Sequence, residues 1–127
     1  MFLTKERYYA IRMARALCNM EKQSVKSLAI KECVPIDFAY KIMKRLENGG
    51  VAYSTRGKNG GYRLSRSPDK ISMFDIMVSI DTRLFISGDI ENRSRDITVH
   101  CRVAEEYRAL QDRWLNSLQD KTLDTLA

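Results

Sequence analysis

The sequence has few of the side chains that usually build catalytic and metal-binding sites, with one histidine and three cysteines among 127 residues. Cys18, Cys33 and Cys101 lie far apart and form no CxxC pair, and their odd number argues against a disulfide framework. Tetrahedral zinc sites use closely spaced Cys and His ligands, which this chain does not offer. It also has no nucleophile motif and no paired carboxylates in a recognisable loop. We therefore expect no enzyme activity, no metal site and no cofactor.

Long apolar runs are missing as well. No segment approaches the roughly 18–20 apolar residues that a membrane span needs. The first residues, MFLTKERYYAIR, become charged too early for a secretory signal. We therefore expect a cytoplasmic protein without membrane contact. The length of 127 residues fits one domain, or one compact domain with an appendage, and an apolar content of 44% is enough for a core.

Basic charge is present, and it is unevenly placed. Residues 1–66 carry 14 Lys and Arg against 5 Asp and Glu, whereas residues 67–127 carry 8 against 11. The first half is therefore the candidate for binding a polyanion. The alternative is that these side chains only keep the surface soluble, but so large an excess in half of a small chain argues against it.

Three helices are predicted in the basic half. Thr4 can cap the first, which we expect to run to about Met20, with Cys18 as a core residue beside its apolar stripe. Ser24 can cap a second, short helix that ends near Cys33, which we also expect in the core. Pro35 suits the start of a third helix, expected over residues 36–48 and ended by two glycines.

Two short helices joined by a tight turn, behind a longer first helix, are the outline of a helix-turn-helix. The third helix places its apolar residues at the i, i+3, i+4, i+7 spacing of one face: Ala39, Ile42, Met43 and Leu46. Its outward face carries the long polar and basic side chains that a helix in the major groove needs: Asp37, Tyr40, Lys41, Lys44 and Arg45. From this helix alone, an ordinary solvated face is an equal alternative.

The next segment favours nucleic-acid binding. Residues 51–54 and 62–64 read as two strands, and Asn59-Gly60 between them is a strong hairpin signal because both residues tolerate positive φ. A helix-turn-helix followed by a basic hairpin is a winged helix, whose wing can contact phosphates or the minor groove. The basic residues of this hairpin are Arg56, Lys58 and Arg63, and Tyr62 and Leu64 are expected to attach the hairpin to the body. A nucleotide P-loop is excluded because the Gly-Lys-Ser/Thr ending is missing.

The acidic half begins with a short helix capped by Ser72, with Asp75 completing a capping box. Its apolar side is expected to pack the wing onto the first helix, through Phe74, Met77, Val78 and Ile80. A long helix is predicted over residues 98–120. The 4, 3, 4 spacing of its apolar residues favours packing on a helix of a second copy: Val103, Tyr107, Leu110 and Trp114. The alternative is packing on its own domain.

These elements predict a mainly α fold with a small β-hairpin. We expect a winged helix-turn-helix domain over residues 1–80, a loop over 81–97 that is the candidate sensor region, and a dimerisation helix with a C-terminal tail over 98–127.

The chain resembles the Rrf-two family of bacterial transcriptional regulators over essentially its whole length. The most specific part is the RGxxGGYxL element from Arg56 to Leu64. The resemblance implies a winged helix-turn-helix repressor or activator that forms a homodimer through its long C-terminal helix and binds a near-palindromic operator. Many members hold an iron–sulfur cluster with three cysteines, of which only Cys101 is matched here. We therefore expect no conventional cluster.

The leading hypothesis is a regulator that binds double-stranded DNA as a homodimer, probing the major groove with Tyr40, Lys41 and Lys44. The wing is expected to contact the backbone or the minor groove through Arg56, Lys58, Asn59 and Arg63. The signal is expected to be a small ligand, a partner protein or oxidation of Cys101, and the alternative for Cys101 is an inert residue. The alternative function is a winged-helix protein-interaction module without DNA binding.

Overall fold

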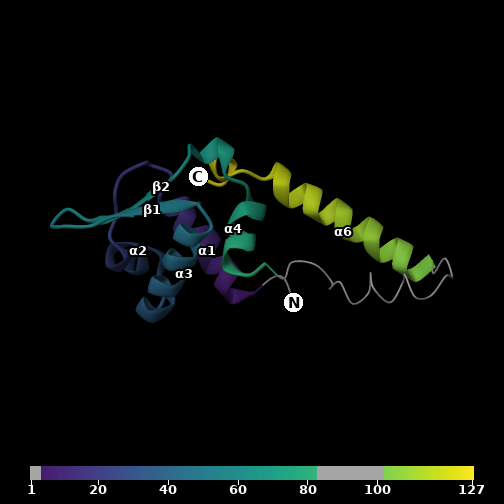
Figure 1. Cartoon of the computed structure of the whole chain (residues 1–127), viewed down its shortest axis with the longest axis horizontal. Coiled ribbons are helices and arrows are strands. Elements are labelled where there is room, and N and C mark those ends of the chain that lie inside the picture. The colour runs from purple at the N-terminus through teal and green to yellow at the C-terminus, as the bar shows by residue number, and fades with distance from the viewer. Residues whose placement is uncertain (1–3, 83–101) are drawn as a thin grey trace.

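The computed structural model describes residues 4–82 and 102–127 of the chain. The described part is mostly helical with one antiparallel hairpin, which confirms the predicted fold class. A helical body lies in the middle, the hairpin extends from one end, and the last long helix extends from the other (Figure 1). The elements, labelled as in that figure, are α1 (Lys5–Ala16), α2 (Val25–Glu32), α3 (Ile36–Asn48), β1 (Ala52–Thr55), β2 (Gly61–Leu64), a 3-10 turn (Pro68–Lys70), α4 (Met73–Ile80), α6 (Arg102–Asp120) and a second 3-10 turn (Leu123–Thr125).

The predicted caps are present at the starts of three helices. The side chain of Thr4 accepts the N–H of Arg7, and the side chain of Ser24 accepts the N–H of Ser27. At α4 the capping box is complete, because Ser72 and Asp75 each accept the backbone N–H of the other, at 3.1 and 3.0 Å. Each side-chain oxygen satisfies a donor that the first helical turn leaves unpaired.

Helix α1 ends at Ala16, several residues before the predicted end at about Met20. The side-chain amide nitrogen of Gln23 donates a hydrogen bond to the carbonyl oxygen of Ala16 at 2.8 Å. This bond satisfies one of the acceptors that the end of the helix leaves unpaired. Met20 has a φ of 61°, a left-handed conformation that does not continue a helix. The chain turns there and carries Gln23 to the hairpin.

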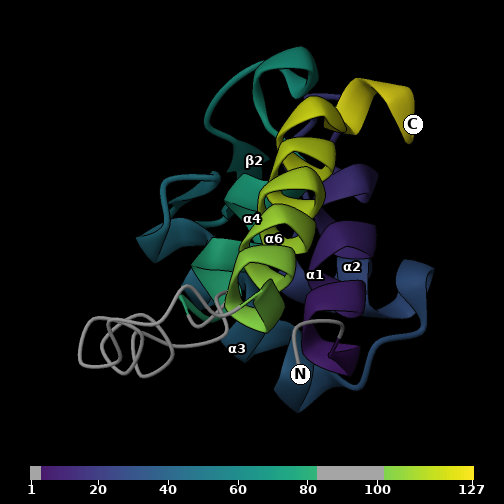
Figure 2. The same cartoon turned by 90° about the vertical axis from the view of Figure 1, so that its right-hand side faces the viewer.

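The core lies where the apolar faces of α1, α2 and α3 meet. Leu64 from the hairpin, Ile76 from α4 and Leu123 from the C-terminal turn complete it. Figure 2 shows α6 in front of α4, with α1 beside them. Helix α4 packs on α1 and α3 with one side and on α6 with the other.

The prediction for α4 is confirmed for Met77 and Ile80, which are buried, and for its packing on α1, but it was wrong about the other side chains. Ile76, which was not on the predicted apolar side, is fully buried, whereas Phe74 and Val78 pack only partly, toward α6. Strand β1 packs on α3, whereas the main contacts of α4 are with α1, α3 and α6. The reason is that α4 has apolar residues on two sides, and its sequence does not show which neighbour each side meets.

The end of α4 is held by a buried arginine of α1. Arg7 is 2% exposed, and its guanidinium donates to the carbonyl of Asp81 at 2.8 Å and to that of Met77 at 3.4 Å. A cation at the C-terminus of a helix is favoured by the helix dipole. None of the described helices is long and apolar enough to cross a membrane.

Candidate nucleic-acid interface

Helix α3 presents the predicted polar face to solvent. Tyr40 is 57% exposed, and Asp37, Lys41 and Lys44 are exposed beside it. The apolar residues on the opposite side of α3 are buried. Lys44 lies 3.8 Å from Glu47 one turn further on, an exposed pair that contributes little to stability. The face is therefore held by the packing behind it and remains open in front.

Arg45 is exposed on the outward side of α3, as expected, but the body of the protein holds its guanidinium. Its guanidinium lies 3.7 Å from the carboxylate of Glu6 and donates to the carbonyl of Ile80 at 3.3 Å. These contacts connect α3 to α1 and α4. Arg45 therefore positions α3, while Lys41 and Lys44 stay available to a ligand.

The turn between α2 and α3 contradicts the expectation that Cys33 is a core residue. Cys33 is exposed and adopts a left-handed conformation, with φ 54° and ψ 42°, at the end of α2. The next residue, Val34, is buried instead and donates its N–H to Ala29 at 2.9 Å. The left-handed residue reverses the chain direction, so the inward position shifts by one residue. Pro35 then starts α3 as predicted.

The wing is an antiparallel hairpin that pairs Ala52 with Leu64 and Thr55 with Gly61. Its turn differs from the predicted one. The N–H of Gly60 donates to the carbonyl of Gly57 at 2.9 Å, so Lys58 and Asn59 are the central turn residues, and both have negative φ. The positive φ occurs at Gly57, with a value of 113°. A five-residue loop, with glycine where left-handed backbone is needed, replaces the expected two-residue Asn-Gly turn.

A clasp of three side chains, Glu47, Ser54 and Tyr62, joins α3 to the wing. The hydroxyl of Tyr62 and that of Ser54 hydrogen-bond to the Glu47 carboxylate. The bond from Tyr62 is the main reason why the pKa of Glu47 lies below its usual value. Burial, this hydrogen bond and the Glu47 charge raise the pKa of Tyr62 to about 12. Tyr62 and the fully buried Leu64 thus attach the wing to the body, as predicted.

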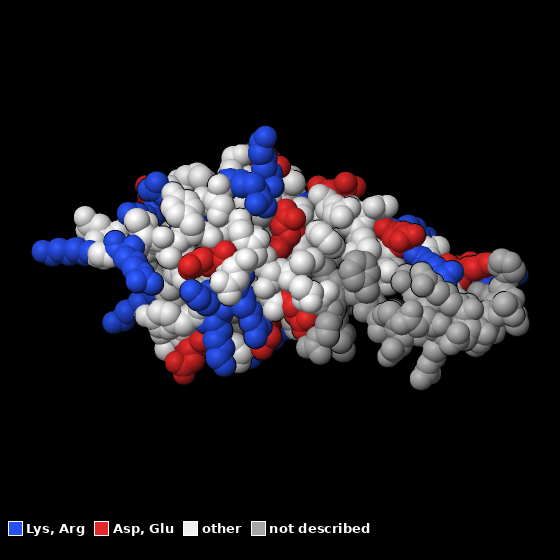
Figure 3. Space-filling view, viewed as in Figure 1, with Lys and Arg blue, Asp and Glu red and all other residues white. Residues whose placement is uncertain are grey.

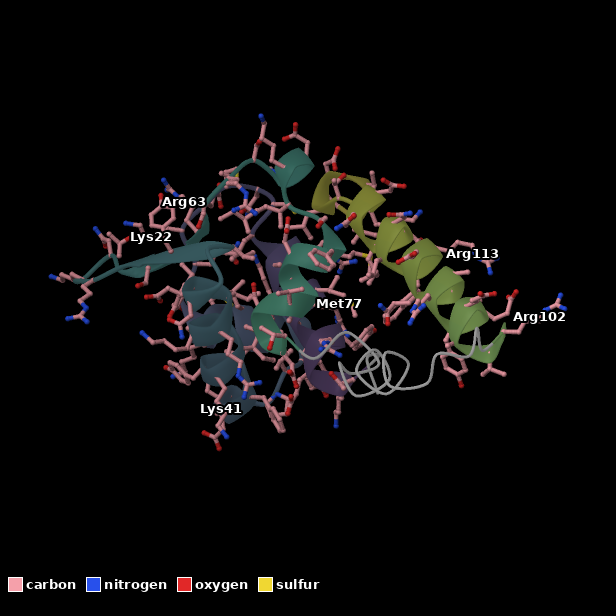
Figure 4. The ribbon with its side chains drawn as sticks, turned by 45° about the vertical axis from the view of Figure 1, so that its right-hand side comes forward. Lys22, Lys41, Arg63, Met77, Arg102 and Arg113 are labelled. Atoms are coloured by element: carbon pink, nitrogen blue, oxygen red, sulfur yellow. The ribbon has the colours of Figure 1, made fainter. Side chains whose placement is uncertain are left out.

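The cations at the wing do not all lie on one side. Arg56 and Lys58 are exposed in the loop at the tip. Arg63 lies on the strand face opposite to Tyr62 and Leu64, because successive side chains of a strand point to opposite faces. Figure 4 shows Arg63 on one side of the hairpin and Lys41 on the other. The structure therefore does not bring Arg63 together with the α3 side chains.

Ion pairing distinguishes some basic residues of the first half from others. Arg12 and Arg15 pair with Glu32, Lys44 with Glu47, Arg45 with Glu6, and Arg66 with Asp75. Within residues 4–82 and 102–127, a second group makes no hydrogen bond or ion pair through its side chains: Lys22, Lys26, Lys41, Arg56, Lys58 and Arg63. Figure 3 shows Lys and Arg side chains over the hairpin and below it. Sequence reasoning missed Lys22 and Lys26, because free and paired cations look alike in a sequence.

Helix α6 has an apolar face that the described part of the chain covers only at one end. Leu118 is buried against Met77 of α4, and Trp114 packs partly on the same cluster. Toward the start of the helix, Val103, Tyr107 and Leu110 are 63, 49 and 56% exposed. The end of α6 thus packs on its own domain, which was the alternative prediction, while the rest of the predicted seam stays exposed. Cys101 lies outside the described residues.

Comparisons with known proteins match these features over the whole chain. A sequence model of the Rrf2 family, described as iron-dependent transcriptional regulators, matches residues 3–127. The chain belongs to this family. It is 32% identical to protein aau3 of Rhizobium meliloti (strain 1021) over 133 residues, covering 99% of this chain and 84% of that protein. A relative from Aquifex aeolicus (strain VF5), named as an HTH-type transcriptional regulator, is 36% identical over 72 residues, which cover 56% of this chain and 50% of the relative.

Solved structures of Rrf2 regulators share the fold. CymR, the global cysteine regulator of B. subtilis, superposes with a TM-score of 0.74 at 23% identity, covering 98% of this chain and 95% of CymR. IscR of T. potens superposes with a TM-score of 0.73 at 19% identity, covering 98% of this chain and 84% of IscR. The Rrf2 family consists of DNA-binding transcriptional regulators and not of enzymes, which agrees with the functional class expected from the sequence.

The described part of the chain does not fit the iron named in the family description. Within residues 4–82 and 102–127, no three His, Cys, Asp or Glu side chains come together as metal ligands. Cys18 is half-buried against the core, its thiol contacts the carbonyl of Ala14 at 3.9 Å, and burial raises its pKa, which disfavours the thiolate that a metal binds. Cys33 lies exposed at the α2–α3 turn.

Proposed function

We propose that this Rrf2 protein is a repressor that binds a near-palindromic operator as a homodimer, with α3 in the major groove and the wing at the adjacent minor groove. Tyr40, Lys41 and Lys44 reach base edges and phosphates from α3. The wing residues Arg56, Lys58, Asn59 and Arg63 contact the backbone and the minor groove.

One observation supports this proposal most strongly: cations without protein partners lie on α3 and the wing, and these two elements are fixed to each other. Lys41, Arg56 and Lys58 make no ion pair within the described residues, so binding phosphate breaks no existing contact. The clasp at Glu47 connects α3 to the hairpin. A rigid arrangement of donors loses little conformational entropy on binding.

Dimerisation is proposed through α6. Its exposed Val103, Tyr107 and Leu110 continue the line of Trp114 at helical spacing, and a matching helix from a second copy would cover them. Two copies related by a twofold axis would present two α3 helices to one side of a duplex. Half-sites about 34–36 Å apart, one helical turn, or a multiple of this distance, fit such a pair.

The regulating signal is proposed to act near residues 81–97, which precede α6 in the sequence. The candidates are a small ligand, a partner protein and oxidation of Cys101. We also propose that no conventional iron–sulfur cluster is held. An absorbance spectrum of the anaerobically purified protein tests this point, and charge-transfer bands in the visible range would overturn it.

Selection of bound duplexes from a random pool tests the proposed function. We expect an enriched, near-palindromic site whose binding is weakened by Lys41→Gln and left unchanged by Lys70→Gln, an exposed lysine on the 3-10 turn away from α3. Repeating the selection after thiol oxidation, with metabolite mixtures and with Cys101→Ser identifies the signal. No enrichment and no duplex binding at low salt would instead support a protein-interaction module. A reporter placed behind the selected site distinguishes repression from activation.

A further inference from the structure

The two faces of the wing lie in different environments. One face points toward α3 and the core and includes the Tyr62 and Ser54 side chains of the clasp, together with Ala52 and Leu64. The outer face points away from them and is formed by Tyr53, Thr55, Gly61 and Arg63. A cation on the outer face therefore contacts something other than the groove that α3 enters.

A second cation lies along this outer face. The backbone of Gln23 forms a bridge with Tyr62, with hydrogen bonds of 3.0 and 2.7 Å. A Cβ added at Gly61 would lie 2.7 Å from the Gln23 carbonyl oxygen and 3.1 Å from Cγ of Lys22. Because Gly61 and Arg63 share a strand face, the stem of Lys22 runs along the side of the wing that carries Arg63. Figure 4 shows both side chains on the same side of the hairpin.

Neither cation is satisfied by the protein within the described residues. No hydrogen bond or ion pair involves the side chain of Lys22 or Arg63 there. Nε of Arg63 is the only buried side-chain nitrogen or oxygen in that part of the chain without a hydrogen-bond partner. Buried donors without acceptors are uncommon in native proteins. An anion that binds at this face of the wing can therefore be stabilised by both positive charges.

The shape of duplex DNA indicates what this anion is. The minor groove is about 6 Å wide and has a phosphate backbone on each side. When α3 occupies the major groove and the wing tip enters the adjacent minor groove, one backbone passes between α3 and the wing. The other backbone passes along the outer face of the wing. We infer that Lys22 and Arg63 form a phosphate-binding pair for this outer strand, so that the wing is held from both sides.

This inference rests on the proposed function. It adds Lys22 to the DNA interface and assigns Arg63 to the outer DNA strand. The selected duplex is prepared with single neutral methylphosphonate linkages, placed one at a time along each strand. Binding of the full chain is measured as a function of salt for Lys22→Gln and Arg63→Gln. Lys70→Gln is the matched control, and thermal melting checks that each variant folds.

We expect Lys22→Gln and Arg63→Gln to weaken binding to all duplexes by the same factor, whatever their base sequence. The slope of log K against log salt should become shallower by about 0.9 for each phosphate that the variant no longer neutralises. Each such lost contact corresponds to roughly 8-fold weaker binding at 0.1 M salt. Neutral linkages in the outer strand should weaken the wild-type protein and leave Lys22→Gln unaffected at the same position. The inference is overturned if both variants match Lys70→Gln while Lys41→Gln still weakens binding. If the wild-type protein binds no duplex, the proposed function fails as well.

Discussion

At the residue scale, the pair of Glu47 and Tyr62 illustrates how far a sequence predicts a side chain's role. The hairpin pattern predicted that Tyr62 attaches the wing to the body, and its packing against the core confirms this. Its partner Glu47 was not predicted, because the two residues are fifteen positions apart and meet only when α3 and β2 have packed. Cys33 was placed wrongly for a related reason, since a left-handed helix end moves the buried position to the next residue.

Removing one hydroxyl group from the clasp tests its role. Tyr62→Phe keeps the packed ring and deletes the hydrogen bond to Glu47, so we expect a stability loss of about 1 kcal/mol. Duplex affinity should also fall, because the wing is no longer fixed relative to α3. Denaturant unfolding and equilibrium binding measure the two effects. Tyr53→Phe, on the outer face of the hairpin, is the matched control. Equal stability and equal duplex affinity of the two variants would show that the clasp has no positioning role.

The clasp also has a pH signature. Glu47 has a lowered pKa in the folded protein, so its stabilising contribution is present above its ordinary pKa near 4.5 and is lost as the pH falls through the lower folded value. Tyr62 has a pKa raised from 10.0 to about 12, so its contribution is present below pH 10 and is lost as the pH rises toward 12.

Ultraviolet titration of the tyrosines measures this directly. The chain has six tyrosines, and we expect one of them to ionise late, near pH 12. The late step should disappear in Tyr62→Phe and remain in Tyr53→Phe. A late step that survives in Tyr62→Phe would assign the raised pKa to another tyrosine.

At the scale of elements, periodicity predicted most of the helices and failed at chain reversals. The stripe of Ala39, Ile42, Met43 and Leu46 identified the buried face of α3, and the capping box identified the start of α4. The loop of the wing was predicted from the Asn59-Gly60 pair, but the chain places the glycine with positive φ at Gly57. Several glycines close together allow more than one turn, and contacts with the rest of the fold select one of them.

The tight contact between β2 and the α1–α2 loop leads to a prediction at this scale. Gly61→Ala would place a methyl group 2.7 Å from the carbonyl oxygen of Gln23, so the bridge between Gln23 and Tyr62 must open. We expect a stability loss of roughly 1–3 kcal/mol and weaker duplex binding. Denaturant unfolding gives the first value. Asn59→Ala, at the exposed tip of the same hairpin, should keep wild-type stability. A Gly61→Ala protein as stable as Asn59→Ala would show that the bridge tolerates a side chain.

At the scale of the whole molecule, α6 and the basic half have separate tasks in the proposed regulator. The first half carries the excess of basic residues, and α6 carries an exposed apolar line that the described part of the chain covers only at Trp114 and Leu118. The sequence predicted this division from charge and spacing alone. It did not show that one end of α6 packs on its own domain, because the same spacing serves packing within a chain and between chains.

A charge placed on the exposed seam tests the assembly. Leu110→Glu puts a carboxylate where we propose that a second copy packs, and we expect a shift from dimer to monomer with a large loss of affinity for the palindromic site. Analytical ultracentrifugation measures the mass in solution. Gln119→Glu, which adds the same charge elsewhere on α6, should leave the dimer intact. A wild-type protein that is monomeric at high concentration would contradict the proposed dimer.

The salt dependence of duplex binding tests the central claim most directly. If the unpaired cations of α3 and the wing bind the phosphates of DNA, affinity for the selected duplex falls steeply between low and moderate salt, by about 0.9 in log K per log unit of salt for each phosphate contacted. The slope should become shallower when Lys58 of the wing is replaced by Gln and stay unchanged when Lys70 is replaced. A binding constant that barely changes over the same salt range would contradict the account.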